Sequence, residues 1–140
     1  MDFNLIFFLA GILIVGALMF GVICLFGKKG NKILDIEHYR ARVLEIEHQL
    51  KQGDQPTYHL SVLNSDKLVD QALRDRGIKG KTMGERMKSY NDSFSDRNGI
   101  WAAHKIRNRI AHDSEASVSY SEARYALQNF RKALKDLGAI

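Results

Sequence analysis

The sequence contains very little cysteine or proline: Cys24 and Pro56 are the only examples among 140 residues. A single cysteine cannot form an intrachain disulfide, and it cannot supply the ligand set of a thiolate metal site. The absence of a disulfide framework fits a reducing compartment. We therefore expect a fold that is stabilised by packing, not by covalent or metal cross-links.

Several catalytic patterns are also absent. The sequence has no carboxylate cluster of the kind that holds Mg²⁺, no glycine-rich phosphate loop, no nucleophile elbow and no HExxH zinc motif. No segment alternates apolar and polar residues for long enough to predict a β-strand. We therefore expect an all-α protein with no metal and no cofactor.

The charged residues give a formal net charge of +5 and a pI of 9.4. Such a balance suits contact with phosphate, either in nucleic acid or in anionic lipid. The alternative is that the surplus serves solubility alone. Charge by itself does not choose between these interpretations.

An uncharged segment near the N-terminus predicts a membrane anchor. Residues 5–26 contain no charged side chain and no proline, and as a helix they span about 33 Å, close to the hydrocarbon thickness of a bilayer. We predict a short flank at residues 1–4, a transmembrane helix at residues 5–27, and the lipid bilayer as a partner. A cleaved signal peptide is the alternative, but its positive region should precede the apolar stretch.

Lysines at the end of this segment predict its orientation. Lys28, Lys29 and Lys32 follow the span, and no lysine or arginine precedes it. Positive residues stay on the cytoplasmic side of a membrane. The prediction is a single-pass protein of the cell inner membrane, with its N-terminus outside and its C-terminal domain in the cytoplasm.

Residues 28–53 predict a juxtamembrane linker helix. Its apolar residues recur at alternating spacings of three and four, which is a heptad seam, formed by Ile36, Tyr39, Val43, Ile46 and Leu50. This stripe has two interpretations. The seam either forms an exposed or dimerising stalk, which we favour, or it packs on the chain's own domain.

Residues 54–140 predict an antiparallel bundle of helices. Thr82 with Glu85, and Ser119 with Glu122, have the spacing of capping boxes that open helices. Apolar spacing and glycine stops place the remaining ends. The predicted helices cover residues 56–76, 82–90, 96–111 and 119–137.

The densest group of polar side chains lies at the end of the helix predicted over residues 96–111. A histidine beside a permanent cation suits phosphodiester chemistry, because imidazole transfers protons and guanidinium stabilises developing negative charge. Cleavage of RNA by attack of its own 2′-hydroxyl needs no metal. The alternative is that His112 only stabilises the helix C-terminus and that the arginines are solvated. The candidate residues for RNA or phosphate binding are His104, Lys105 and Arg109, beside the candidates for catalysis Arg107, Asn108 and His112.

The run Arg107-Asn108-Arg109-Ile110-Ala111-His112 resembles the Arg-x4-His motif of the HEPN superfamily. The similarity covers residues 56–140. The flanking segments 66–68, 80–86 and 101–105 resemble uncharacterised bacterial single-pass membrane proteins that carry such a domain.

The resemblance implies an up-and-down helical bundle that forms a homodimer and joins two motifs at one cleft. It also implies a metal-independent endoribonuclease in which Arg107 and His112 carry the chemistry and Asn108 orients them. Other members of the superfamily bind nucleotides or serve as interaction modules. A non-catalytic, membrane-tethered module is therefore the alternative, and the sequence identifies no protein partner.

Overall fold

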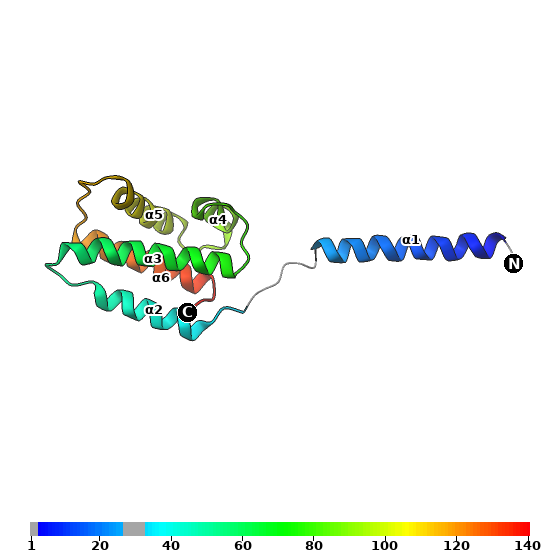
Figure 1. Cartoon of the computed structure of the whole chain (residues 1–140), viewed down its shortest axis with the longest axis horizontal. Helices are drawn as coiled ribbons and strands as arrows, with labels where there is room; N and C mark the ends of the chain where they lie inside the picture. The colour runs from blue at the N-terminus through cyan, green and yellow to red at the C-terminus, as the bar shows by residue number, and fades with distance from the viewer. Residues whose placement is uncertain (1–2, 27–32) are drawn as a thin grey trace. The chain divides into compact units, whose positions relative to one another are not determined.

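The computed structural model describes residues 3–26 and 33–140 of the chain (Figure 1). These residues form helices and no β-strand, so the prediction of an all-α fold is confirmed for them. The chain divides into two compact units, Met1–Asn31 and Lys32–Ile140. Each unit is described by itself below.

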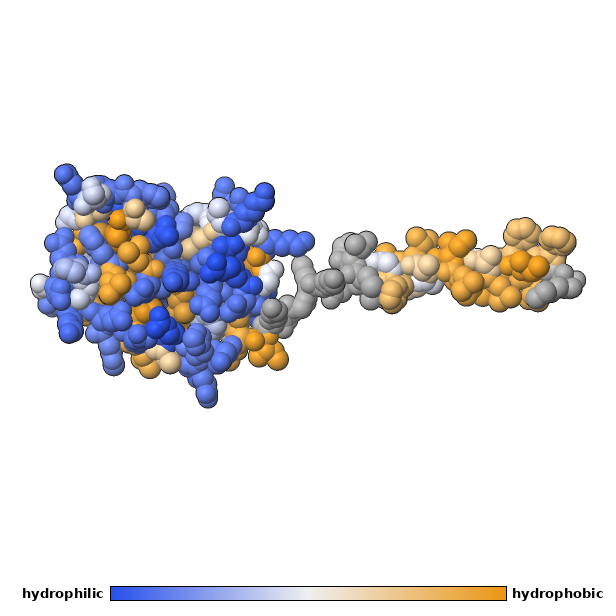
Figure 2. Space-filling view, in the orientation of Figure 1, coloured by the Kyte–Doolittle hydropathy of each residue, from blue (hydrophilic) through white to orange (hydrophobic). Residues whose placement is uncertain are grey.

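The first unit contains helix α1, Phe3–Phe26, which begins close to the predicted start of the span. It is long and apolar enough to cross a membrane. Apart from Asn4, its described side chains are apolar, and the large ones are exposed, as the colours of Figure 2 show. The lysines on which the predicted orientation depends, Lys28, Lys29 and Lys32, lie outside the described residues, as does the end of the predicted span at Gly27.

The second unit is the helical bundle. Helix α3 runs through it and contacts each of the other α-helices of the unit, and α5 also packs against α6. The elements in chain order are α2 Ile36–Gln49, α3 Gln55–Asp75, α4 Met83–Ser89, the short 3₁₀ helix η1 Asn91–Ser93, α5 Arg97–His112 and α6 Tyr120–Asp136.

Helix α2 corrects the interpretation of the heptad seam. Tyr39, Val43 and Ile46 are buried against α3, so the exposed stalk that we favoured is wrong. The Tyr39 hydroxyl also donates a 2.7 Å hydrogen bond to Asp75 at the end of α3, and its burial together with this carboxylate raises the Tyr39 pKa far above its usual range. A stalk would leave these apolar side chains in water, whereas α3 offers them a dry surface. Helix α2 therefore belongs to the same compact unit as residues 54–140, and not to a separate linker.

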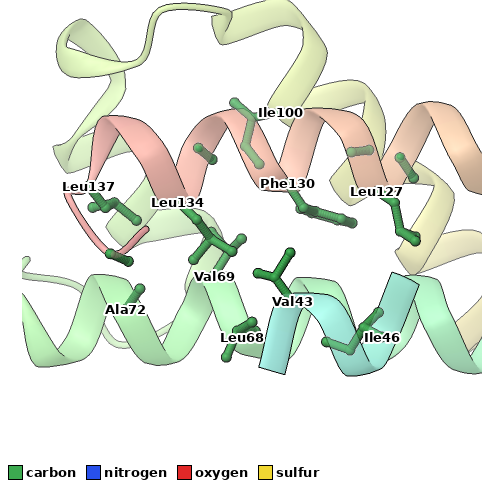
Figure 3. Close-up of a cluster of buried hydrophobic side chains, with 14 of the residues drawn as sticks. Val43, Ile46, Leu68, Val69, Ala72, Ile100, Leu127, Phe130, Leu134 and Leu137 are labelled. Atoms are coloured by element: carbon green, nitrogen blue, oxygen red, sulfur yellow. The ribbon is translucent and has the colours of Figure 1, made fainter. Parts of the chain in front are cut away.

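The core of the bundle lies between α2, α3, α5 and α6 (Figure 3). Phe130 of α6 and Ile100 of α5 are each 1% exposed, and Val69 of α3 is fully buried. The side chains that Figure 3 labels around them are Val43, Ile46, Leu68, Ala72, Leu127, Leu134 and Leu137.

The predicted helix starts follow from local hydrogen bonds. At α6 both halves of the capping box are present, since Ser119 accepts from the Glu122 backbone and Glu122 accepts from the Ser119 backbone. At α4 the Thr82 hydroxyl accepts a hydrogen bond from the backbone N–H of Glu85. The Glu85 carboxylate, however, accepts from the backbone N–H of Lys81 and not from that of Thr82. These bonds satisfy backbone donors that a helix start leaves free.

Gly99 in the first turn of α5 provides a test of this packing. A Cβ atom at Gly99 would lie 2.1 Å from Asn129 Oδ1 and 2.7 Å from the Asp96 carboxyl group. We expect Gly99→Ala to lower the free energy of unfolding by about 1 to 3 kcal/mol, the usual cost of overpacking. Urea denaturation followed by circular dichroism measures this change.

Gly84→Ala is the matched control for this substitution. A Cβ at Gly84 meets only Thr82 Oγ1, at 3.9 Å, which is an ordinary contact. Because alanine is the better helix former, the control should be neutral or stabilising by up to about 1 kcal/mol. Equal urea midpoints for Gly99→Ala and Gly84→Ala would contradict the close approach of α5 to α6.

Candidate functional site

A cavity of about 680 Å³ lies between α3, the start of α4 and α5. It contains four of the six site residues that the sequence predicts, together with polar groups from the facing helices. Its lining is formed by Leu63, Asn64, Asp66, Lys67, Asp70, Thr82, Met83, Gly84, His104, Arg107, Asn108 and His112.

Asp66 on α3 is the most buried charged group of this lining. Its side chain is 4% exposed, and its two oxygens contact different residues of α5. Oδ1 lies 2.7 Å from His104 Nδ1, and Oδ2 lies 3.1 Å from Arg107 Nε. One carboxylate therefore connects α3 to two of the predicted site residues.

Arg107 is held on two sides while a third of its side chain stays exposed. Its Nη1 donates a 3.0 Å hydrogen bond to Asn108 Oδ1. Its Nε contact with Asp66 is an ion pair, but the N–H direction does not have hydrogen-bond geometry. The guanidinium is thus oriented by its neighbours and remains accessible to a ligand.

Asp70 of α3 lines the cavity on the side of α4 and pairs with Arg86 of that helix. Arg86 donates to Asp70 Oδ1 from Nε at 2.8 Å and from Nη2 at 2.6 Å, and its Nη1 donates to the Gly80 carbonyl at 2.7 Å. Arg74 approaches the second oxygen of Asp70 at 3.5 Å. This carboxylate is occupied by its partners, so it fixes α4 against α3.

Two predicted residues, Lys105 and Arg109, do not line the cavity. Lys105 is exposed, and Arg109 donates a 2.6 Å hydrogen bond to Glu122 at the start of α6. The Ser119 backbone N–H, and after it Arg109, hold the pKa of Glu122 below its usual range. The phosphate contact predicted for this pair is therefore not part of the site around Arg107.

His112 lies in the last turn of α5, and its side chain is exposed. It lines the same cavity as Arg107 and Asn108. The position also agrees with the alternative interpretation, because a basic residue in a last turn interacts favourably with the helix dipole. The structure brings the three predicted catalytic residues to one cavity, with His112 at its exposed end.

Asp66 is the site residue that sequence reasoning missed. A signal was present, because Asp66 occupies the buried stripe of α3 in register with the apolar residues Val62, Val69 and Leu73. A carboxylate among such positions needs a partner when it is buried. That requirement could have identified it, although not the partners themselves.

No group of three or more histidine, cysteine, aspartate or glutamate side chains in the described ranges is placed to hold a metal ion. Besides the carboxylates of Asp66 and Asp70, the polar groups at the cavity include one accessible guanidinium, one lysine ammonium, two imidazoles and two amides. Such groups can bind a phosphate, stabilise its negative charge and transfer protons. These groups are compatible with acid–base chemistry on a phosphate ester and with simple phosphate binding.

The residues on which the sequence-based expectation of a HEPN-like domain depends lie on α5 and in flanking segments of α3, α4 and α5. Segments 66–68 and 80–86 contribute Asp66, Lys67, Thr82, Met83 and Gly84 to the cavity that the motif lines. Comparison of the chain with protein-family models, with curated proteins and with solved structures gives no significant match.

Proposed function

We propose that this protein is a membrane-anchored, metal-independent endoribonuclease of the HEPN type. The observation that supports the proposal is the convergence of Arg107, Asn108 and His112 on one cavity of about 680 Å³. In the proposal, α1 spans the inner membrane, the bundle faces the cytoplasm, and two copies form the active homodimer. The uncharged length of α1 and the lysines after it support this topology.

The proposed reaction is an internal transesterification of RNA. A ribose 2′-hydroxyl loses its proton and its oxygen bonds to the adjacent phosphorus, while the bond from phosphorus to the 5′ oxygen breaks. Arg107 stabilises the charge that develops on the phosphate, and His112 gives a proton to the departing 5′ oxygen. The products are a 2′,3′-cyclic phosphate and a 5′-hydroxyl, and no metal takes part.

The proposal predicts RNA cleavage that depends on two residues. Full-length protein in detergent should cleave a labelled single-stranded RNA in the presence of EDTA. Arg107→Ala and His112→Ala should each lower the rate roughly 10²-fold or more, because each removes a group that acts in the transition state. The measurement is initial rate by gel electrophoresis of the labelled products.

Arg131→Ala is the charge-matched control. Arg131 lies on α6, pairs with Glu47 at 2.6 Å and does not line the cavity. This variant loses one positive charge, as Arg107→Ala does, but it should keep the full rate. Unchanged cleavage by both Arg107→Ala and His112→Ala would sink the assignment of the site.

The charges at the cavity support a second candidate, a nucleotide-binding or interaction module without turnover. Lys67 and Arg107 line the cavity together with Asp66 and Asp70, but Asp70 is already paired with Arg86 from outside the lining. One surplus positive charge therefore remains for an anion even when the histidines are neutral. This module predicts salt-sensitive nucleotide or RNA binding that Arg107→Ala weakens. Binding without cleavage products would favour it over the ribonuclease.

A further inference from the structure

Two side chains at the floor of the cavity have a relation that the Arg-x4-His motif does not include. Asp66 and His104 are separated by 38 residues in the chain, yet their side chains meet at 2.7 Å. We infer that they form a proton-transfer dyad in which Asp66 is a positioning residue and His104 accepts the 2′-hydroxyl proton. This inference rests on the proposed ribonuclease function and adds a second histidine to it.

The burial of the pair supports a fixed orientation of the imidazole. The side chains of Asp66 and His104 are 4% and 12% exposed. The Trp101 ring meets the His104 ring edge-on, with centroids 6.2 Å apart, and Trp101 Nε1 donates to Asn91 Oδ1 at 3.2 Å. The carboxylate on one side and the anchored indole on the other leave the imidazole little freedom.

The contact of His104 Nδ1 with Asp66 decides which ring nitrogen of His104 can accept a proton. An ionised carboxylate only accepts hydrogen bonds, so the Nδ1 atom that faces Asp66 carries a proton. In the neutral imidazole the opposite nitrogen, Nε2, then has a free lone pair. Among the described residues Nε2 of His104 has no hydrogen-bond partner, while the residue lines the cavity. This is the arrangement of a base that a carboxylate orients.

The same carboxylate places the base beside the cation. His104 and Arg107 are three apart on α5 and share a face, and each contacts one oxygen of Asp66. A phosphate that binds to the Arg107 guanidinium is therefore next to His104. This proximity is what a base needs in order to reach the hydroxyl adjacent to that phosphate.

The dyad completes the proton balance of the proposed reaction. His104 Nε2 accepts the 2′-hydroxyl proton while the 2′ oxygen bonds to phosphorus. The bond from phosphorus to the 5′ oxygen breaks, and His112 donates the proton that this oxygen needs. The Cα atoms of the two histidines are about 12 Å apart along α5, a span that two imidazole side chains and a phosphodiester between them can bridge.

The positioning role of Asp66 can be measured without substrate. We would record the imidazole ¹⁵N chemical shifts of full-length protein in detergent micelles, with His104→Gln to identify the signals. The wild type should show His104 protonated at Nδ1 and unprotonated at Nε2. Asp66→Asn should lose this preference, and identical His104 signals in the two proteins would overturn the positioning role.

The catalytic role of His104 is tested by cleavage of the same labelled RNA with EDTA present. His104→Ala and Asp66→Asn should each lower kcat by on the order of 10²-fold or more, with little change in KM. Added imidazole should restore part of the rate to His104→Ala and none to Asp66→Asn. A residue that only supports the fold would not show this rescue. His48→Gln, an exposed histidine of α2 outside the cavity, should keep the wild-type rate.

The outcomes separate the dyad from the function on which it rests. If the wild type cleaves RNA and His104→Ala cleaves equally well, the dyad is overturned and the proposed function stands. If the wild type does not cleave RNA at all, both fall. Loss of kcat in His104→Ala with rescue by imidazole, together with the shifted tautomer in Asp66→Asn, supports the dyad.

Discussion

A fragment that begins at residue 54 is expected to lack a cooperative unfolding transition, while a fragment of residues 33–140 is expected to have one. The shorter fragment lacks α2 and the residues directly before it, and with them the buried side chains of Leu34, Tyr39, Val43 and Ile46. Each such side chain contributes roughly 1.5 to 3 kcal/mol when buried. Their loss is comparable with the whole stability of a domain of this size, about 5 to 15 kcal/mol.

Circular dichroism during urea titration distinguishes the two fragments. Two substitutions in the longer fragment compare the loss of stability at a buried and at an exposed position of α2. Ile46→Ala, at a position 3% exposed, should cost about 2 to 5 kcal/mol. Leu44→Ala, two residues earlier and 53% exposed, should stay within about 0.5 kcal/mol. A sharp transition in fragment 54–140 would show that α2 is dispensable after all.

Arg86→Met is expected to be the most destabilising single substitution of a charged residue in the bundle. Arg86 is 8% exposed at its side chain, and its removal leaves Asp70 at 16% exposure without its two closest contacts. Breaking such a buried pair costs about 3 to 5 kcal/mol, because the remaining charge is poorly solvated. The free energy of unfolding from urea titration measures this loss.

Two comparisons show whether the cost comes from the unpaired carboxylate. Arg97→Met breaks an exposed pair with Asp92, whose side chains are 58% and 97% exposed, and should cost less than about 1 kcal/mol. Adding Asp70→Asn to Arg86→Met should recover part of the stability, since the neutral amide is cheaper to bury. If Asp70→Asn gives no recovery, packing of the arginine stem and not charge explains the effect.

The helices could be predicted from the sequence because their ends depend on neighbouring residues. Ser119 and Glu122 are three apart and make the capping box that their spacing predicts. The role of α2 could not be predicted in the same way. Residues spaced like Tyr39, Val43 and Ile46 suit a partner chain or the chain's own α3 equally well, and only the fold decides which surface covers them.

The candidate site was predictable to the extent that it lies on one helix. Arg107, Asn108 and His112 are close in sequence, and they line one cavity. Asp66 comes from another helix, so no local spacing reveals its contacts with His104 and Arg107. The position of Arg109 outside the cavity could not be predicted for the same reason. Its partner Glu122 lies on another helix, beyond the loop that follows α5.

The bond from Arg109 to Glu122 has a consequence for the motion of the cavity rim. It ties the last turn of α5, where His112 lies, to the first turn of α6. Both side chains are more than 40% exposed, so the tie contributes only about 0.2 to 1 kcal/mol and weakens as salt screens it. Ionic strength is therefore expected to change how firmly the last turn of α5 is held to the start of α6, and with it the freedom of His112 at the exposed end of the cavity.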